Sequence, residues 1–282
     1  MISKTQKIKA GLYLVSTPIG NLEDITIRAL NILRKSDIIL CEDTRVSAKL
    51  LSFFQIKKKL FSYHKFNEKK STSKLIDELR QGKILSLISD AGTPAVSDPG
   101  RILINECVDN NIPIIPIPGA SSVTASASIS GFSEKFIFFG FLSEKESTMI
   151  KELEMLGKIN CAIIIFSSPR KFLKNLKKFQ EYFEDREVVI CREMTKLHEE
   201  FVRLKVNNLT NLNLNIKGEL TVIFSEKKNI IKNFNYLNES DKKKIEKMLK
   251  KKTIKDIVKE FKGKGIPKRI IYNYCLEKKN EN

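Results

Sequence analysis

The sequence is poor in the side chains that build metal centres and disulfide frameworks. It has only two histidines, His64 and His198, and its five cysteines are scattered without any C-x-x-C pair. Structural zinc sites need closely spaced ligands, and disulfide frameworks need an even set of cysteines. We therefore expect no metal site, and we expect the cysteines to be reduced residues of the core.

Long apolar runs and the common nucleotide-binding fingerprints are also absent. No stretch reaches the ~18 apolar residues of a membrane span, and the opening MISKTQKIK lacks the apolar segment of a signal peptide. We therefore expect a cytoplasmic protein with no membrane contact. Neither G-x-G-x-x-G nor G-x-x-x-x-G-K-[ST] occurs, so a cofactor must bind through another loop geometry.

Acidic residues are scarce relative to basic ones, and the imbalance is uneven along the chain. The formal net charge is +18, and the residues from Lys227 onward hold eighteen Lys or Arg against seven Asp or Glu, which is +11 of that total. A coding bias toward Ile, Lys and Asn would raise the lysine content everywhere, but it does not explain this asymmetry. Clustered cations favour a polyanionic partner, so we expect contact with nucleic acid.

The first part of the chain alternates strand-like and helix-like segments. Apolar runs at 12–16, 37–41, 84–88 and 112–117 alternate with helical patterns at 22–35, 44–54, 71–81 and 100–110. This alternation is typical of βαβ units. We predict an α/β domain over residues 1–117, built as a doubly wound parallel sheet.

The remaining residues predict two further parts. Residues 118–226 should form a second α/β domain with a mixed sheet, because the run 199–206 alternates polar and apolar residues with a period of two. Residues 227–282 should form a small basic helical segment that resembles a helix-turn-helix bundle. A basic and partly disordered tail is the alternative for that segment. The predicted strands of the second domain are 136–142, 161–166, 186–191, 199–206 and 218–224; the predicted helices of the last two parts are 121–131, 145–157, 169–183, 240–251, 253–261 and 267–278.

Three of the apolar runs end in loops of Gly, Pro, Ser and Thr. These are TPIGN at 17–21, SDAGTPAVSDPG at 89–100 and PGASS at 118–122. Open α/β sheets bind ligands at the carboxyl ends of their strands, and small residues let the backbone approach a ligand closely. The sequence therefore predicts a small-molecule site where these loops meet.

The same loops carry a family resemblance. TPIGNLEDITIRAL (17–30), CEDTR (41–45), SDAGTPAVSDPG (89–100), PGASS (118–122), FFGFL (138–142) and REMTKLHEE (192–200) resemble the ribosomal RNA small subunit methyltransferase I family. That family belongs to the tetrapyrrole-methylase-like class of S-adenosylmethionine enzymes. The resemblance implies a two-lobed fold that holds S-adenosylmethionine in the cleft between the lobes.

The resemblance also implies which residues bind the cofactor. The positions that match the family's cofactor contacts are Pro18, Ala91, Gly92, Thr93, Val96, Ser121 and Ser122. Asp90 is a candidate partner for the cofactor's ammonium group, or alternatively an ordinary loop-capping carboxylate. Ser167 is a further candidate for a cofactor contact, although relatives usually carry Glu before Ser-Pro where this chain has Ser167.

Two mixed clusters of charged residues are candidates for handling the acceptor. Methyl transfer to a hydroxyl needs an aligned acceptor and benefits from a base or a stabilising cation. The first cluster is residues 42–45 and the second is residues 192–200. We predict catalytic roles for Asp43 and Arg45 in the first and for Lys196 and Glu199 in the second. The alternative is that both clusters are salt-bridged surface or a clamp between the domains.

The resemblance implies methylation of the ribose 2′-hydroxyl of a cytidine in small-subunit (16S) ribosomal RNA, by a homodimer. One alternative is an enzyme of the same class that acts on a tetrapyrrole or a protein side chain. Another is a non-catalytic RNA-binding factor for ribosome assembly that keeps the fold.

Overall fold

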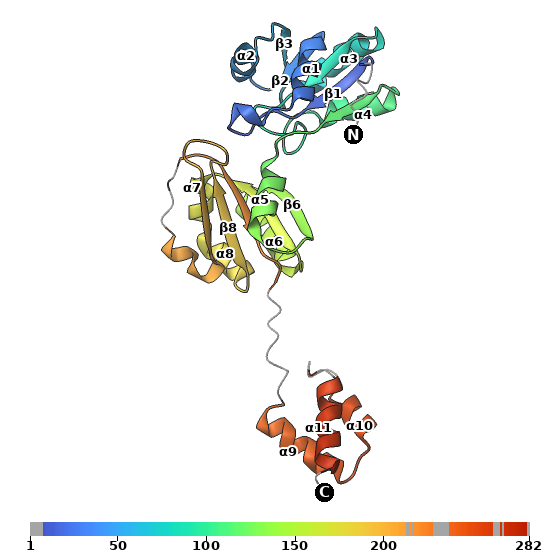
Figure 1. The fold of residues 1–282 in the computed structure, drawn as a ribbon, viewed down its shortest axis with the longest axis vertical. Coiled ribbons are helices and arrows are strands. Elements are labelled where there is room, and N and C mark those ends of the chain that lie inside the picture. The colour runs from blue at the N-terminus through green and yellow to red at the C-terminus, as the bar shows by residue number, and fades with distance from the viewer. Residues whose placement is uncertain are drawn as a thin grey trace. The chain divides into compact units, whose positions relative to one another are not determined.

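The chain folds into two compact units. The computed structural model describes residues 8–212, 215, 217–227, 237–261, 266 and 268–280. The first unit is Met1–Glu226 and contains two sheets, and the second is Lys227–Asn282 (Figure 1).

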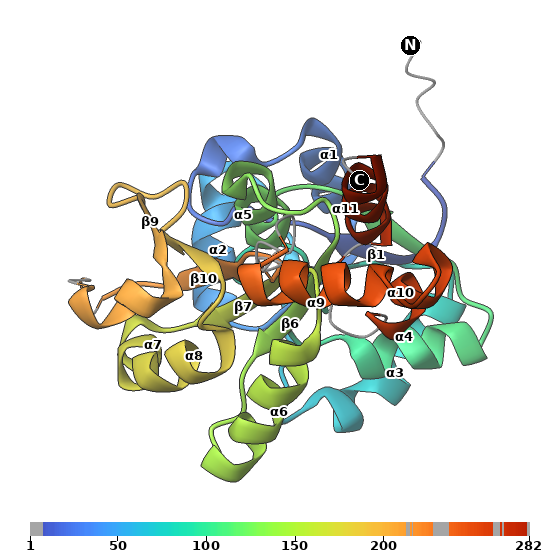
Figure 2. The ribbon, with the colours of Figure 1, turned by 90° about the horizontal axis from the view of Figure 1, so that it is seen from below.

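The first sheet is parallel and has helices on both faces. Its five strands lie in the order β3-β2-β4-β1-β5. One face packs on α1 and α2, and the other packs on α3 and α4, which lie side by side (Figure 1 and Figure 2). The elements are β1 (Gly11–Val15), α1 (Ile27–Lys35), β2 (Ile38–Cys41), α2 (Thr44–Phe53), β3 (Lys59–Ser62), α3 (Glu68–Arg80), β4 (Ile84–Leu87), α4 (Arg101–Asp109) and β5 (Ile114–Ile117).

The central strands of this sheet are apolar because both of their faces are covered. All four residues of β2 are buried, and three of the four residues of β4 are buried. Strands buried on two faces are near-continuous apolar runs rather than alternating ones. This is why the sequence pattern alone predicted a doubly wound parallel sheet, which the structure confirms.

The second sheet is mixed and has the order β6-β7-β10-β8-β9. Strands β6 and β7 are parallel, whereas β10 is antiparallel to both of its neighbours and β9 is antiparallel to β8. In β9 burial alternates residue by residue, as its period-two pattern predicted. The elements are α5 (Ser122–Ser130), β6 (Phe136–Phe141), α6 (Glu146–Lys158), β7 (Ala162–Ser167), α7 (Pro169–Lys174), α8 (Leu176–Phe183), β8 (Glu187–Arg192), β9 (Glu200–Lys205) and β10 (Leu220–Phe224).

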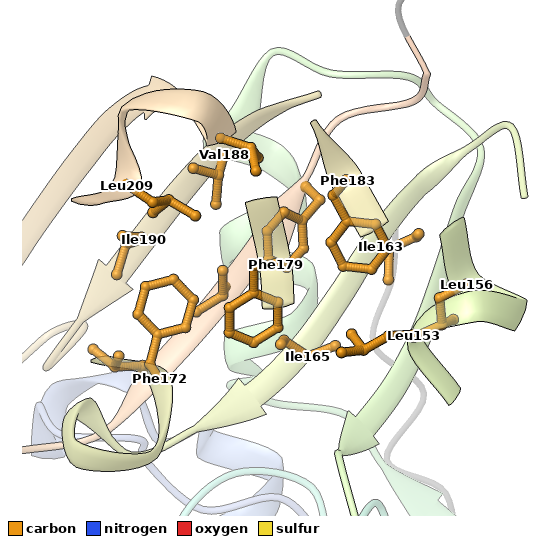
Figure 3. Close-up of a cluster of buried hydrophobic side chains, with 14 of the residues drawn as sticks. Leu153, Leu156, Ile163, Ile165, Phe172, Phe179, Phe183, Val188, Ile190 and Leu209 are labelled. Atoms are coloured by element: carbon orange, nitrogen blue, oxygen red, sulfur yellow. The ribbon is translucent and has the colours of Figure 1, made fainter. Parts of the chain in front are cut away.

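Aromatic rings dominate the core on one face of this sheet (Figure 3). Phe172 stacks on Phe179 with ring centroids 5.0 Å apart, and Phe183 lies 4.6 Å from Phe224. Each buried aromatic side chain contributes a large apolar area, so helices α7 and α8 are held to the strands mainly by these rings. Helix α5 covers the opposite face.

A buried arginine ties the edge of this second core together. Arg186 is 1% exposed, and its guanidinium donates to the carbonyl oxygens of Leu156, Ile159, Cys161 and Ser225. Two of these carbonyls belong to the end of α6, where the helix dipole favours a positive charge. The cation thus holds the end of α6, the start of β7 and the end of β10 in one place.

The second unit is a small helical bundle with its own core. Asn238 and Thr253 cap α9 (Glu239–Leu249) and α10 (Ile254–Glu260), and α11 is Lys268–Asn280. Ile245, Ile257, Phe261, Ile271 and Cys275 form the core. The predicted basic helical segment is therefore confirmed, although part of the polar stretch 227–239 lies outside the described residues. In the part of the chain that the structure describes, no helix has the length and apolar character of a membrane span.

Three elements differ from the expectations. Strand β3 was not predicted, because it is a short edge strand that begins at the last of three consecutive lysines and is mostly half-exposed. The predicted helix 22–35 is instead a 3₁₀ turn at Leu22–Asp24 followed by α1, because the Thr26 hydroxyl accepts from the Ala29 amide and starts a new helix. The predicted helix 169–183 breaks into α7 and α8 at Asn175.

We predict that Arg186→Met lowers the free energy of unfolding by about 3 kcal/mol or more, because it leaves several buried carbonyls without a donor. Denaturant unfolding of both proteins measures the difference. Arg203→Met is the matched control, since the exposed Arg203 donates to the Ile129 carbonyl alone. Equal losses from the two substitutions would contradict the role of Arg186.

Candidate functional site

Two loops at the carboxyl edge of the first sheet are joined backbone to backbone. The Thr17 amide donates to the Gly92 carbonyl at 2.9 Å, and the Gly92 amide donates to the Thr17 carbonyl at 3.1 Å. The Thr17 hydroxyl donates to the Ser89 carbonyl at 3.1 Å, and the hydroxyls of Ser16 and Thr93 lie 3.0 Å apart. The loops after β1 and β4 therefore form one rigid surface.

Two glycines make this close approach of the loops possible. Gly92 has a φ of +82°, a conformation that L side chains rarely adopt. Gly119 lies in the loop after β5, and a Cβ atom placed there would lie 2.8 Å from the Cβ of Ser16. The third predicted loop thus packs directly against the first.

A pocket of about 370 Å³ opens where these loops face the second sheet. The first lobe contributes Ile19 and the loop after β4, and the second lobe contributes the start of α5, the ends of β6, β7 and β8 and the start of β10. The lining residues are Ile19, Asp90, Ala91, Gly92, Thr93, Val96, Ser97, Asp98, Ser121, Ser122, Val123, Phe141, Phe166, Ser167, Ser168, Cys191, Glu193, Met194, Lys196, Gly218, Glu219, Leu220 and Thr221.

Most of the residues that were predicted to bind the cofactor line this pocket. Those that line the pocket are Asp90, Ala91, Gly92, Thr93, Val96, Ser121, Ser122 and Ser167. Pro18 is not among them, because it is buried beside the Thr17–Gly92 pairing. Asp90 also has a structural role, since one carboxylate oxygen accepts from the Asp43 amide at 3.2 Å.

Of the predicted catalytic residues, only Lys196 lines the pocket. Its ammonium group lies 3.1 Å from Glu193 Oε1 and 2.9 Å from Glu219 Oε2. Burial alone would lower the pKa of Lys196, but the hydrogen bonds to Glu219 and Glu193 outweigh it and raise that pKa. Lys196 is therefore a fixed cation at neutral pH and not a base.

The other three predicted catalytic residues stabilise the loops that carry them. Asp43 caps α2 and pairs with Arg45 at 2.7 Å, and hydrogen bonds from Arg45 lower the pKa of Asp43 to about 2. Glu199 accepts from the Thr195 amide at 2.7 Å. Their predicted roles in catalysis stay predictions.

Several lining residues were missed because only the folded chain brings them together. Glu193 follows β8 and Glu219 precedes β10, and the two are joined by backbone pairing and by the Glu219 amide on Glu193 Oε1 at 2.9 Å. Phe141 lies 5.4 Å from Phe166, ring centre to ring centre. Asp98 could have been found, because it belongs to the predicted loop 89–100.

The two lobes meet at a strained turn beside the pocket. The Asn21 amide of the first lobe donates to the Thr195 hydroxyl of the second at 3.0 Å. Glu193 and Thr195 have φ angles of 50° and 64°, and Ala95 and Ser97 in the facing loop have 63° and 67°. Non-glycine residues in this region cost on the order of 1 kcal/mol or more each, and such residues cluster at functional sites.

The wall is acidic, although the chain as a whole is basic. Four carboxylates line the pocket, those of Asp90, Asp98, Glu193 and Glu219, and Lys196 is the one Lys or Arg in the described wall. Burial, followed by repulsion from Glu42 and Asp90, raises the pKa of Asp98 to about 6, while a hydrogen bond with Ser89 opposes the rise. The pocket therefore favours a ligand that carries positive charge.

Comparison with known proteins identifies the family. A model described as Tetrapyrrole (Corrin/Porphyrin) Methylases matches residues 11–210. The Ribosomal RNA small subunit methyltransferase I of Mesomycoplasma conjunctivae is 45% identical over 226 residues, which cover 79% of this chain and 94% of that protein. The protein of the same name from Thermotoga maritima is 46% identical over 77% of this chain and 98% of its own length. The chain belongs to the ribosomal RNA small subunit methyltransferase I branch of the tetrapyrrole methylases.

Solved structures share the two-lobed tetrapyrrole methylase fold and confirm that expectation. Uroporphyrin-III C-methyl transferase from Thermus thermophilus, complexed with S-adenyl homocysteine, has a TM-score of 0.57 at 16% identity, over 77% of this chain and 97% of that chain. A diphthine synthase has a TM-score of 0.58 at 17% identity, over 76% and 89% of the two chains.

Membership makes this tetrapyrrole methylase an S-adenosylmethionine-dependent methyltransferase, and its pocket fits that cofactor. The acidic wall matches the positive charges of a sulfonium and an ammonium group. The residues that supply apolar surface for a nucleoside are Ile19, Phe141, Phe166 and Met194.

No group of three or more His, Cys, Asp or Glu side chains that could hold a metal ion occurs among the described residues. All five cysteines are buried.

We predict that Gly92→Ala weakens S-adenosylmethionine binding about tenfold or more, because its Cβ would lie 3.3 Å from Ile19 Cγ2 in a strained backbone. Gly82→Ala is the matched control: Gly82 has the same φ of +82°, with no atom within 4 Å of the added Cβ. Calorimetric titration of both variants measures the affinities. If Gly92→Ala and Gly82→Ala lose the same affinity, the positive φ that they share is the cause and the contact with Ile19 in the pocket is not.

We predict that Asp98→Asn stabilises the protein at neutral pH. The pKa of Asp98 is about 6 in the folded chain against an ordinary 3.8, so the folded state binds the proton more tightly. The ionised carboxylate therefore costs stability above pH 6, on the order of 2 kcal/mol, and nothing well below pH 4. Thermal unfolding should show a higher Tm for Asp98→Asn at pH 7.5 and a difference that disappears about one pH unit or more below the ordinary pKa of 3.8. Asp109→Asn, which removes an exposed carboxylate, controls for the change in net charge.

Proposed function

We propose that this tetrapyrrole methylase transfers a methyl group from S-adenosylmethionine to the ribose 2′-hydroxyl of a cytidine in small-subunit ribosomal RNA. The observation that carries the proposal is the pocket between the lobes, where the loops after β1, β4 and β5 meet and four carboxylates from both lobes line the space. The names of relatives at 45% and 46% identity support the RNA substrate. The sequence motifs that resemble the ribosomal RNA small subunit methyltransferase I family, such as TPIGNLEDITIRAL at 17–30, support the ribose 2′-hydroxyl as the methyl acceptor.

The chain's own residues would hold and align the reactants. Bound S-adenosylmethionine supplies an electrophilic methyl carbon on sulfur. Thr93 and the backbone around Gly92 orient the donor, while Phe141, Phe166 and Met194 keep water from it. The acceptor oxygen gains the carbon as the carbon–sulfur bond breaks, and it must release its proton to a base.

Asp98 is the carboxylate best suited to accept that proton. Its pKa of about 6 lies close to neutral pH, where a general base is most effective. The pKa of Asp43 is about 2, which makes Asp43 a weak base.

Lys196 keeps its charge, so it is proposed to position the acceptor and to stabilise developing negative charge on the oxygen. Arg45, whose side chain is 87% exposed, is proposed to contact RNA phosphate. Glu199 is proposed to act through the loop that it holds.

The basic second unit is proposed to bind RNA phosphates. Less than four fifths of this chain matches 94% and 98% of the lengths of the two relatives named above. Methyl transfer therefore does not require the part of this chain that those relatives do not match. In the helices of the second unit, Lys243, Lys247 and Lys255 are exposed. Such contacts bind the backbone without reading sequence and fix the position of the substrate.

The assembly and the cellular location are also proposals. The family resemblance supports a homodimer, and exposed apolar side chains agree with one, since Ile27 is 79% exposed and Leu197 is 93% exposed. A ribosomal RNA target supports action in the cytoplasm.

We predict that the purified chain transfers a labelled methyl group from S-adenosylmethionine to small ribosomal subunits or their RNA. Nuclease digestion and mass spectrometry should place the methyl on a cytidine ribose, and Gly92→Trp should abolish the transfer. Labelling of a tetrapyrrole or a protein instead would assign the chain to another substrate of the same class. RNA binding without any labelling would indicate a non-catalytic assembly factor.

A further inference from the structure

A phenylalanine stands almost fully in solvent at the edge of the first sheet. Phe66, in the loop between β3 and α3, is 95% exposed, the largest exposed fraction among the large apolar side chains of the described residues. Aromatic rings with this exposure are favoured where they bind a partner.

The loop that carries Phe66 lies on the same edge of the sheet as the pocket. All neighbouring strands of this sheet are parallel, so the carboxyl ends of β3, β2 and β4 form one row. Two strand spacings, about 10 Å, separate β3 from β4, whose loop lines the pocket. Glu68, two residues after Phe66, accepts from the Gly100 amide at the end of that loop at 3.3 Å.

Hydrogen bonds hold the Phe66 loop in a fixed shape. The Asn67 side chain accepts from the His64 amide at 2.9 Å and donates to the Ser62 carbonyl at 2.9 Å. The Phe66 amide donates to His64 Nδ1 at 3.3 Å, and the two rings lie edge to face at 6.0 Å. Because the loop is ordered before anything binds, little further entropy is lost when a ligand contacts the ring.

Three lysines lie within four residues of Phe66 in the sequence. Lys65, Lys69 and Lys70 are exposed, and none of them has an ion-pair partner within 4 Å among the described residues. The combination of an exposed aromatic face with unpaired lysines matches a single-stranded nucleic acid, whose bases stack and whose phosphates carry negative charge. A second protein chain would favour apolar side chains beside the ring, whereas the exposed sequence neighbours of Phe66 are lysines.

We propose that Phe66 stacks on a base of the RNA strand next to the nucleotide that enters the pocket, while Lys65, Lys69 and Lys70 contact the adjoining phosphates. The proposal rests on the proposed RNA substrate and gives this loop the task of positioning the strand. Stacking tolerates any base, so the contact adds affinity and alignment rather than sequence reading.

The test uses the full chain and a short single-stranded RNA that carries 2-aminopurine, whose fluorescence falls when it stacks. We expect Phe66→Ala to weaken RNA binding about tenfold and to abolish the quenching, and Phe66→Trp to retain both. Phe53→Ala is the matched control, because Phe53 is 64% exposed but lies at the far end of α2, about 15 Å along that helix from the edge of the sheet. S-adenosylmethionine affinity should be unchanged in all three variants.

Binding and fluorescence are equilibrium measurements, so their outcome does not depend on methyl transfer. If the native chain shows no transfer to ribosomal RNA but Phe66→Ala still loses quenching, the proposed function fails and the stacking stands. RNA binding that is equal in Phe66→Ala and Phe53→Ala would overturn the stacking proposal. A change in oligomeric state of Phe66→Ala on gel filtration, with RNA binding intact, would also overturn it and would assign the ring to a contact between copies of the chain.

Discussion

Two backbone hydrogen bonds between Thr17 and Gly92 hold the site together. They join the loops after β1 and β4, which are neighbours in the sheet, and the packing of Gly119 on Ser16 adds the loop after β5. Since the pocket wall of the first lobe consists of these loops, its shape depends on backbone pairing more than on particular side chains. This explains why the residues at the junction are small.

The chain as a whole and the lining of its pocket carry net charges of opposite sign. The chain is strongly basic overall, which supports the proposed RNA substrate, while the described pocket lining has four carboxylates and one lysine. An acidic pocket repels phosphate groups, so the backbone of the proposed RNA substrate would stay outside it and an uncharged sugar hydroxyl would enter. The cross-lobe contact between Asn21 and Thr195 keeps both walls in place beside this entrance.

The fold and half of the site could be predicted from local patterns, and the rest required tertiary information. The loops at 17–21 and 89–100 were found because each directly follows an apolar strand; the second contributes seven lining residues to the pocket and the first contributes Ile19. Glu193 and Glu219 are 26 residues apart and meet only because β8 pairs with β10. Strand β3 was missed for a similar reason: a short edge strand lacks the apolar signal of a covered one, and with it the position of Phe66 was hidden.

The acidic wall also bears on how each reaction cycle ends. The donor's sulfur is positively charged before transfer and neutral afterwards, so the carboxylates attract the spent molecule less than the fresh one. The same four side chains that draw the donor in therefore weaken their own hold once the methyl group has left. The loss of the sulfonium charge would therefore favour release of the product from this pocket.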